Sequence, residues 1–308
     1  MEETALLHEL EPTVATLLDR HLETAKEWFP HELVPWGRGR DFQPNEDWDP
    51  NEYEMPDTVR SALFVNLLTE DNLPYYFAHI DSVFKDGPWR AWNRRWTAEE
   101  GRHSIVMRDY LTVTRALDPV DLERGRMQQV STAVVPEPET VADALVYVAL
   151  QELATRISHR NTGKLLTDRA GYDVMARVAA DENLHYLFYR DATSAAIELD
   201  PSTVVIAIER QVREFAMPGV GIPNFATHAR RIADAGVYDF IEHHDHILVP
   251  VVLRSWRVES LEGLTPEAEQ ARERLVSRVA KVGKAAQRLR ERRAERTERA
   301  ERVPSTAA

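Results

Sequence analysis

Six ionisable residues fall on the apolar faces of four predicted helices, and this placement constrains the fold more than any other feature of the sequence. Apolar residues recur at intervals of three and four through most of the chain, and Gly and Pro are sparse inside the long segments. This periodicity is typical of amphipathic helices. Buried carboxylates without partners are very unfavourable, so we expect a cation between them. The six residues are Glu70, Glu100, His103, Glu152, Glu182 and His185.

The four glutamates form a weak internal repeat. Glu70 precedes Glu100 by 30 residues, Glu152 precedes Glu182 by 30, and the two halves are offset by 82. The later glutamate of each half begins an E-x-x-H motif. A spacing of 30 fits two antiparallel helices joined by a short loop, which brings the middles of neighbouring helices level. The sequence therefore predicts two helix pairs, with a crossover connection between residues 116 and 138.

One glutamate from each of two helices, plus Glu-x-x-His from each of the other two, is the ligand set of carboxylate-bridged di-iron and di-manganese bundles. Carboxylates can bridge two metals, and neutral imidazoles complete the coordination of each metal. A single E-x-x-H motif is expected by chance, whereas two at matched positions favour a metal centre. The alternative is that each motif is a separate buried Glu–His hydrogen-bonded pair.

The chain is predicted to be all-α and to form a single domain over residues 1–290, followed by a charged, frayed tail at 291–308. The short breaks between helices contain Pro, Gly or Asp-Pro, and none is long enough to be a domain linker. Helices are expected at 4–27, 57–83, 88–116, 120–130, 138–163, 170–198, 201–216, 223–235, 237–256 and 265–296.

Composition excludes several classes of function. The chain has no Cys, so disulfides, thiolate metal sites and Cys nucleophiles are excluded. The net charge is −13, and because residues 281–302 are locally basic, the rest of the chain is still more acidic. An acidic surface argues against a nucleic-acid partner. No run is apolar enough to predict a transmembrane segment, and the acidic N-terminus lacks the features of a secretory signal, so we expect a cytoplasmic protein.

At these residues the sequence resembles the soluble acyl-acyl-carrier-protein desaturases, the family of stearoyl-ACP desaturase. The similarity covers about residues 5–290 and is strongest in four motifs. These are TEDNLPYY (69–76), WTAEEGRH (96–103), QELATRISHRNTG (151–163) and AADENLHYLFYRD (179–191). Gly101 departs from the family pattern and is an unfavourable residue inside a helix.

The resemblance implies a ferritin-like four-helix core with additional flanking helices. It also implies two carboxylate-bridged iron ions, held by the six residues of the internal repeat. The expected reaction uses dioxygen and two electrons from a ferredoxin-type reductant to introduce a double bond into a saturated acyl chain carried on acyl carrier protein. A homodimer is expected. The other expectations are a small-molecule oxygenase or N-oxygenase, an iron-storing ferroxidase, and a non-catalytic carrier.

The resemblance also assigns roles to three residues outside the ligand set. Thr155 matches a hydroxyl beside the oxygen-binding face, although a threonine in a helix also commonly bonds back to a carbonyl. Asp181 matches an acid that orients a ligand histidine, here His103. Trp28 matches an aromatic residue on the family's proposed route of electron entry.

Three further features have plainer interpretations. Pro74 cannot donate to the carbonyl of Glu70, so the helix should be distorted beyond that residue. His159 lies two turns after Glu152, and we expect a buried, hydrogen-bonded histidine there rather than a ligand. The pair Glu242 and His246, four residues apart, is expected to lie on a solvated or subunit-contact face.

Overall fold

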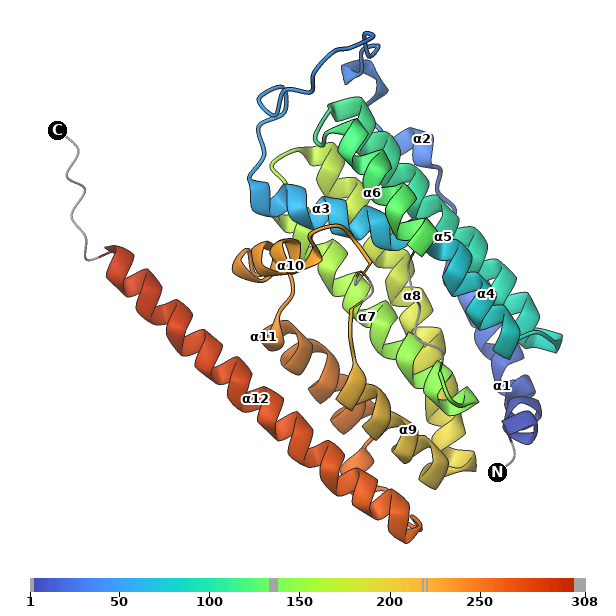
Figure 1. Cartoon of the computed structure of the whole chain (residues 1–308). Coiled ribbons are helices and arrows are strands. Elements are labelled where there is room, and N and C mark those ends of the chain that lie inside the picture. The colour runs from blue at the N-terminus through green and yellow to red at the C-terminus, as the bar shows by residue number, and fades with distance from the viewer. Residues whose placement is uncertain (1–2, 133–137, 218, 220, 302–308) are drawn as a thin grey trace.

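The computed structural model describes residues 3–132, 138–217, 219 and 221–301, and every regular element in these ranges is helical. Figure 1 shows a bundle of long helices, with α12 lying along one side of it. The elements are α1 (Glu3–Thr24), α2 (Pro30–Leu33), η1 (Trp36–Arg38), α3 (Asp57–Glu70), α4 (Leu73–Val83), α5 (Gly87–Thr114), α6 (Pro119–Thr132), α7 (Val141–Leu165), α8 (Arg169–Leu199), α9 (Pro201–Glu214), α10 (Phe225–Asp234), α11 (Phe240–His243), η2 (His244–Ser255), η3 (Val258–Ser260) and α12 (Pro266–Glu301).

Four of these helices form the central bundle. α7 packs along α8, α5 packs on α8, and α3 packs on both α5 and α7, so the four helices close into a ring. α1 covers α5 and α8 from one side, α10 covers α3, and α9 covers α7 and α8. The predicted all-α class with a four-helix core and flanking helices is confirmed.

Local sequence explains where the core helices begin. Thr140 is the N-cap of α7, and its hydroxyl oxygen accepts from the backbone N–H of Asp143 at 3.1 Å. Asp168 caps α8 in the same way, accepting from the N–H of Gly171 at 3.1 Å. These caps satisfy N–H groups that have no partner within the helix, which fixes the start of each helix.

The predicted helix at 57–83 is two helices, and this part of the prediction is wrong. α3 ends at Glu70 and α4 begins at Leu73, with Asp71 and Asn72 between them. Pro74 stands in the first turn of α4 and has no N–H for the carbonyl of Glu70, so the helix ends at the glutamate rather than merely bending after it.

The expected helix at 237–256 also differs, since it consists of the short α11 followed by the π-helical segment η2, which contains Pro250. Residues 133–137 of the expected crossover lie outside the described residues. α12 is continuous across residue 290 to Glu301, and the boundary of the predicted tail stays a prediction. No helix in the described part of the chain combines the length and apolar character needed to cross a bilayer.

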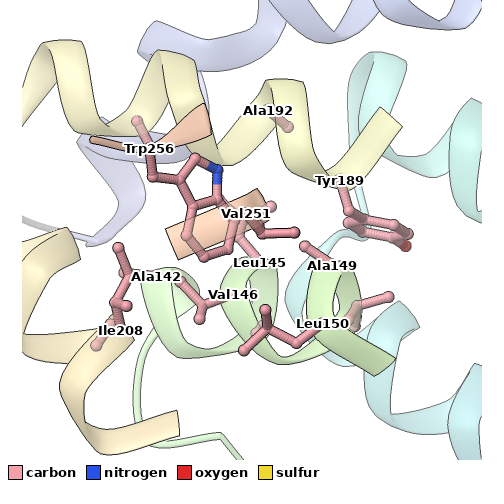
Figure 2. Packing of buried hydrophobic residues seen from close by; sticks show 14 of the residues in the cluster. Ala142, Leu145, Val146, Ala149, Leu150, Tyr189, Ala192, Ile208, Val251 and Trp256 are labelled. Carbon is pink, nitrogen blue, oxygen red and sulfur yellow. The ribbon is translucent and has the colours of Figure 1, made fainter. Parts of the chain in front are cut away.

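Buried apolar residues form two clusters, one toward each end of the bundle. The first cluster includes Trp89, Trp92 and Trp96 of α5 with the second half of α8, and the second includes the later part of α5 with the first half of α8. α5 and α8 are therefore antiparallel. Figure 2 shows part of the first cluster, where small and branched residues of α7 face Tyr189 and Ala192 of α8. The ionisable residues of α5 and α8 lie between the two clusters.

Candidate metal centre

The structure brings the six repeat residues together from four helices. Glu70 is the last residue of α3, Glu152 lies in the middle of α7, and α5 and α8 each contribute one Glu-x-x-His pair. Two groups of four have ligand atoms that all lie within 4.8 Å of one another, and every member is buried. The groups are Glu70, Glu100, His103 and Glu182, and Glu100, Glu152, Glu182 and His185. Glu100 and Glu182 belong to both.

Both imidazoles direct Nδ1 into this cluster. His103 Nδ1 lies 3.3 Å from Glu182 Oε1 and 3.5 Å from an oxygen of Glu70 and of Glu100. His185 Nδ1 lies 2.7 Å from Glu100 Oε1 and 3.5 Å from Glu152 Oε2. Each histidine therefore presents one nitrogen to the carboxylates and leaves Nε2 for an outer partner.

The residues fit a pair of metal ions. Nδ1 of both histidines, Oε1 of Glu100 and Oε2 of Glu152 are buried and have no partner in hydrogen-bonding geometry, although His185 Nδ1 and Glu100 Oε1 lie only 2.7 Å apart. Native structures rarely leave so many buried polar atoms unpaired, and metal coordination would satisfy all four. Carboxylate oxygen and imidazole nitrogen suit iron or manganese, while thiolate ligands are absent from the sequence.

The pKa values show the same need for positive charge. Burial, followed by the charges of Glu182 and Glu100, raises the pKa of Glu152 well above its ordinary value of 4.5. Burial and the charge of Glu182 also raise the pKa of Glu100. Burial opposes ionisation of Glu70 too, but the nearby ring of His103 and the hydrogen bond with His159 outweigh it and its pKa falls. Without a cation, the four carboxylates cannot all be ionised at low cost.

An outer acid approaches Nε2 of each histidine. Asp181 Oδ2 lies 3.5 Å from His103 Nε2 and accepts from Trp28 Nε1 at 2.8 Å. Burial acts to raise the pKa of Asp181, but the nearby ring of His103 and the positive charge of Arg177 outweigh it and lower the pKa to about 2. Glu99 Oε2 lies 3.0 Å from His185 Nε2. An acid at this nitrogen fixes the tautomer that leaves Nδ1 available to a metal.

A small cavity adjoins the cluster on the α3 and α7 side. Glu70, Thr155 and His159 line one part of it, and Met217, Phe225 and Ile232 supply apolar surface. Its volume is about 90 Å³. The cavity places apolar space directly beside one carboxylate of the cluster.

Comparison with known proteins identifies the family. The family model described as fatty acid desaturase matches residues 2–306. The chain belongs to this family.

Relatives support the assignment over most of this desaturase's length. A Mycobacterium tuberculosis protein assigned as the acyl-[acyl-carrier-protein] desaturase DesA1 is 44% identical over 281 residues, which is 88% of this chain and 83% of the relative. A stearoyl-[acyl-carrier-protein] 9-desaturase of Arabidopsis thaliana is 31% identical over 242 residues, 71% of this chain and 60% of the relative. The X-ray structure assigned as the Mycobacterium tuberculosis acyl-ACP desaturase DesA2 superimposes with a TM-score of 0.70 at 28% identity, covering 87% of this chain and 99% of the other.

The structure also places the other predicted residues of the desaturase. Thr155 Oγ1 lies 2.7 Å from Glu182 Oε2, with backbone carbonyls of its own helix at 3.0 and 3.2 Å. Its hydroxyl is thus beside the cluster and also within reach of the helix backbone. His159 is buried and its Nε2 lies 2.8 Å from Glu70 Oε1, so the expected hydrogen-bonded histidine is present.

The second acidic–histidine pair stays apart from the centre. Glu242 and His246 lie 3.6 Å apart, and the His246 side chain is 59% exposed. Within the described residues, the groups able to hold a metal do not include them.

Three residues that surround the centre were not predicted from the sequence. Trp96 Nε1 donates to Glu152 Oε1 at 3.0 Å, Glu99 accepts from His185, and His21 of α1 also bonds to Glu99. A signal for Glu99 was present, because it precedes Asp181 by the same offset of 82 that relates the ligands. His21 continues the apolar stripe of α1, a core-facing position where an imidazole is uncommon.

Proposed function

We propose that this chain is an acyl-acyl-carrier-protein desaturase that introduces a double bond into a saturated acyl chain. The observation that carries the proposal is the pair of buried Glu/His groups sharing Glu100 and Glu182, placed beside an apolar cavity. Relatives over most of the chain bear acyl-ACP desaturase names, which supports acyl-ACP as the substrate. Two iron ions bound by these groups would supply reductive activation of dioxygen.

The proposed ligands are the six residues of the internal repeat. Glu70 and His103 would serve one ion, Glu152 and His185 the other, and Glu100 and Glu182 would be shared because each belongs to both groups. Shared carboxylates hold two cations close together and offset their mutual repulsion.

Residues beside the ligands have separate proposed roles. Thr155 holds a proton at Oγ1, 2.7 Å from Glu182 Oε2, on the side of the site that faces the cavity. Asp181 orients His103, and Trp28 tethers Asp181 from the segment that follows α1. Trp28 is itself buried, and its contact with Asp181 leads to a ligand histidine. This contact supports the proposal that electrons from a ferredoxin-type reductant enter along Trp28, Asp181 and His103.

The cavity beside Glu70 is the proposed site of the acyl carbons to be oxidised. Ligand pockets for larger molecules usually measure about 300–1,000 Å³, so a volume of about 90 Å³ holds only a few methylene groups. The proposal therefore requires the side chains of Met217 and Phe225 to move when a whole chain binds. An apolar lining excludes water from the reacting carbons.

The test is metal analysis followed by turnover. The purified protein, reconstituted anaerobically with ferrous iron, should bind close to two irons per chain and convert stearoyl-ACP to an unsaturated product with ferredoxin, its reductase and dioxygen. Glu182→Ala should lose most of the iron and the product. Glu242→Gln is the matched control, because Glu242 also lies near a histidine but away from the cluster. Iron-loaded protein that consumes reductant without forming product from any acyl-ACP would refute the proposal.

Cytoplasmic location and a homodimer are also proposed. Sizing by light scattering should give about twice the 35.3 kDa chain mass. A shell of many subunits would instead support iron storage.

A further inference from the structure

His21, on the N-terminal helix α1, is buried at the edge of the candidate metal centre without contacting the carboxylates of the cluster itself. Only 4% of the residue is exposed. Its Nε2 lies 2.9 Å from Glu99 Oε2, and its ring stacks at 5.9 Å on the ring of His185. Nδ1 of His21 is buried and makes no hydrogen bond.

Packing alone does not account for an imidazole at this place. The stripe of α1 that leads to it is apolar, and the neighbouring ring of Trp92 meets it edge-on at 5.0 Å. A phenyl ring would fill the same space and would leave no polar atom unpaired. An imidazole with one unpaired buried nitrogen is a desolvation cost, so the bond at its other nitrogen must have a role.

That bond ends on the acid that holds a predicted ligand. Glu99 Oε2 is shared between His21 Nε2 and His185 Nε2, at 2.9 and 3.0 Å, while Glu99 Oε1 accepts from Arg95 Nε at 2.6 Å. Because both oxygens are occupied, the carboxylate can rotate little. With Glu99 held in this way, His185 is kept as the tautomer with its proton on Nε2 and with Nδ1 facing the cluster.

The other half of the site shows the same construction with different residues. Trp28 Nε1 donates to Asp181 Oδ2, and Asp181 approaches His103. Glu99 and Asp181 each precede the glutamate of an E-x-x-H motif, and each contacts the histidine of the other motif. His21 thus corresponds to Trp28, and the two donors lie seven residues apart at the end of α1 and just beyond it.

We infer that His21 is a positioning residue, through which α1 fixes Glu99 and thereby the orientation of His185 toward the metal that His185 would bind. The inference rests on the proposed metal centre. According to this inference, α1, which lies outside the four-helix core, also determines how firmly the metal is retained.

Three variants separate this role from packing. His21→Phe keeps a ring but removes the donor, and His21→Gln keeps an N–H that can reach Glu99. His8→Phe is the control on the same helix, because His8 pairs with Glu11 at 3.0 Å on the surface. Each protein is loaded anaerobically with ferrous iron, and release to a chromogenic ferrous chelator is followed with time.

His21→Phe should release one of the two irons on the order of tenfold faster than the wild type, as expected when the acid that holds a proposed ligand histidine loses one of its own donors. His21→Gln and His8→Phe should stay within about threefold of the wild type. In the metal-free state, the Phe variant at position 21 should melt no lower than the Gln variant, because Phe leaves no buried polar atom unpaired. Faster iron release from the Phe variant would then not come from a weaker fold.

Unchanged release from His21→Phe would overturn the inference. It would also be overturned if His21→Gln released iron as fast as His21→Phe, or if His21→Phe lowered the metal-free melting temperature as much as the metal-loaded one. Failure of the proposed metal centre is a distinct result, since the wild-type chain would then take up no iron at all. Failure of the proposed activity is distinct as well, since iron-loaded wild-type protein would then form no unsaturated product.

Discussion

Replacing Glu152 by Gln should have opposite effects on the metal-free and the metal-loaded protein. Glu152 is buried within 4.8 Å of the ligand atoms of Glu100, Glu182 and His185. Gln removes the charge but keeps the carbonyl oxygen that accepts from Trp96 Nε1. We therefore expect the substitution to relieve repulsion between carboxylates in the metal-free protein. In the metal-loaded protein, we expect it to weaken metal binding.

The size of the first effect follows from the raised pKa. Burial and the neighbouring carboxylates raise the pKa of Glu152 well above 4.5, so between the unfolded and the folded pKa the folded metal-free chain holds a proton that the unfolded chain has released. Each pH unit in that interval lowers the stability of the wild type by about 1.4 kcal/mol. Stability of the wild type should therefore fall as pH rises above 4.5, and the advantage of the Gln variant should grow with pH.

Thermal unfolding in the presence of a chelator measures this difference. At pH 7 the variant should melt above the wild type, by roughly 2–4 °C for each kcal/mol of repulsion that it relieves. With ferrous iron in hundredfold excess over its dissociation constant, the wild type gains about 2.7 kcal/mol per bound ion, and the order should reverse. Glu242→Gln should change neither melting temperature. A metal-free Glu152→Gln protein that melts below the wild type at pH 7 would refute the reasoning, because it would show that the charge stabilises the fold without metal.

Three further predictions concern the surroundings of the site. Gly171→Ala should destabilise the fold by about 1–3 kcal/mol in urea titrations, because a Cβ at that position would clash with the hydroxyl oxygen of Tyr110. Gly101→Ala should stabilise the fold by about 0.5–1 kcal/mol, because its Cβ would meet only Leu73, at 4.0 Å. Equal effects of the two substitutions would contradict the packing argument. Burial, followed by the charges of His244 and Arg278, lowers the pKa of His243 to about 4, so between pH 6.5 and 4 the unfolded chain binds the extra proton and stability falls as pH falls, by up to about 3 kcal/mol. His243→Phe should flatten the plot of unfolding free energy against pH in this range, and an unchanged slope would show that other groups dominate. Thr155→Val should lower the yield of product per electron consumed while iron content stays normal, and Thr155→Ser should restore it; equal yields from all three proteins would remove Thr155 from the proton path.

The cluster of buried Glu and His residues could be predicted from sequence because these residues interrupt apolar stripes. A buried glutamate such as Glu152 stands out against a regular helical period, and the matched offset of 82 links the two halves. The end of α3 at Glu70 could be predicted only in part. Pro74 indicates that a hydrogen bond is lost, but whether a helix bends or ends depends on what packs around the break. Here α4 packs against α5 and α7 as a separate helix.

The residues that contact Nε2 of the two proposed ligand histidines were harder to predict, for a geometric reason. Glu99 is one residue from Glu100, so its side chain is rotated by about 100° around the helix from the core-facing stripe. From sequence alone, this position is therefore predicted to face solvent. It is buried because α1 covers this face of α5 and α8. His21 contacts it across 78 residues of sequence. The hydrophobic periodicity of one helix does not predict which other helix will pack against it.

The acid that precedes the glutamate of each E-x-x-H motif contacts the histidine of the other motif because of the same rotation. α5 and α8 are antiparallel neighbours, so a side chain rotated away from the bundle axis on one helix points toward the other helix. The position before each E-x-x-H glutamate then meets the histidine of the opposite motif, which is how Glu99 reaches His185 and Asp181 reaches His103. An acid at that position on both helices therefore lies beside the histidine that the proposal assigns to each metal ion. The oxygen of each acid that faces a histidine also meets a donor from outside the core, and the N-terminal segment supplies both donors, at His21 and Trp28. Removing α1 should for this reason loosen the metal centre even though α1 contains none of the six predicted ligands.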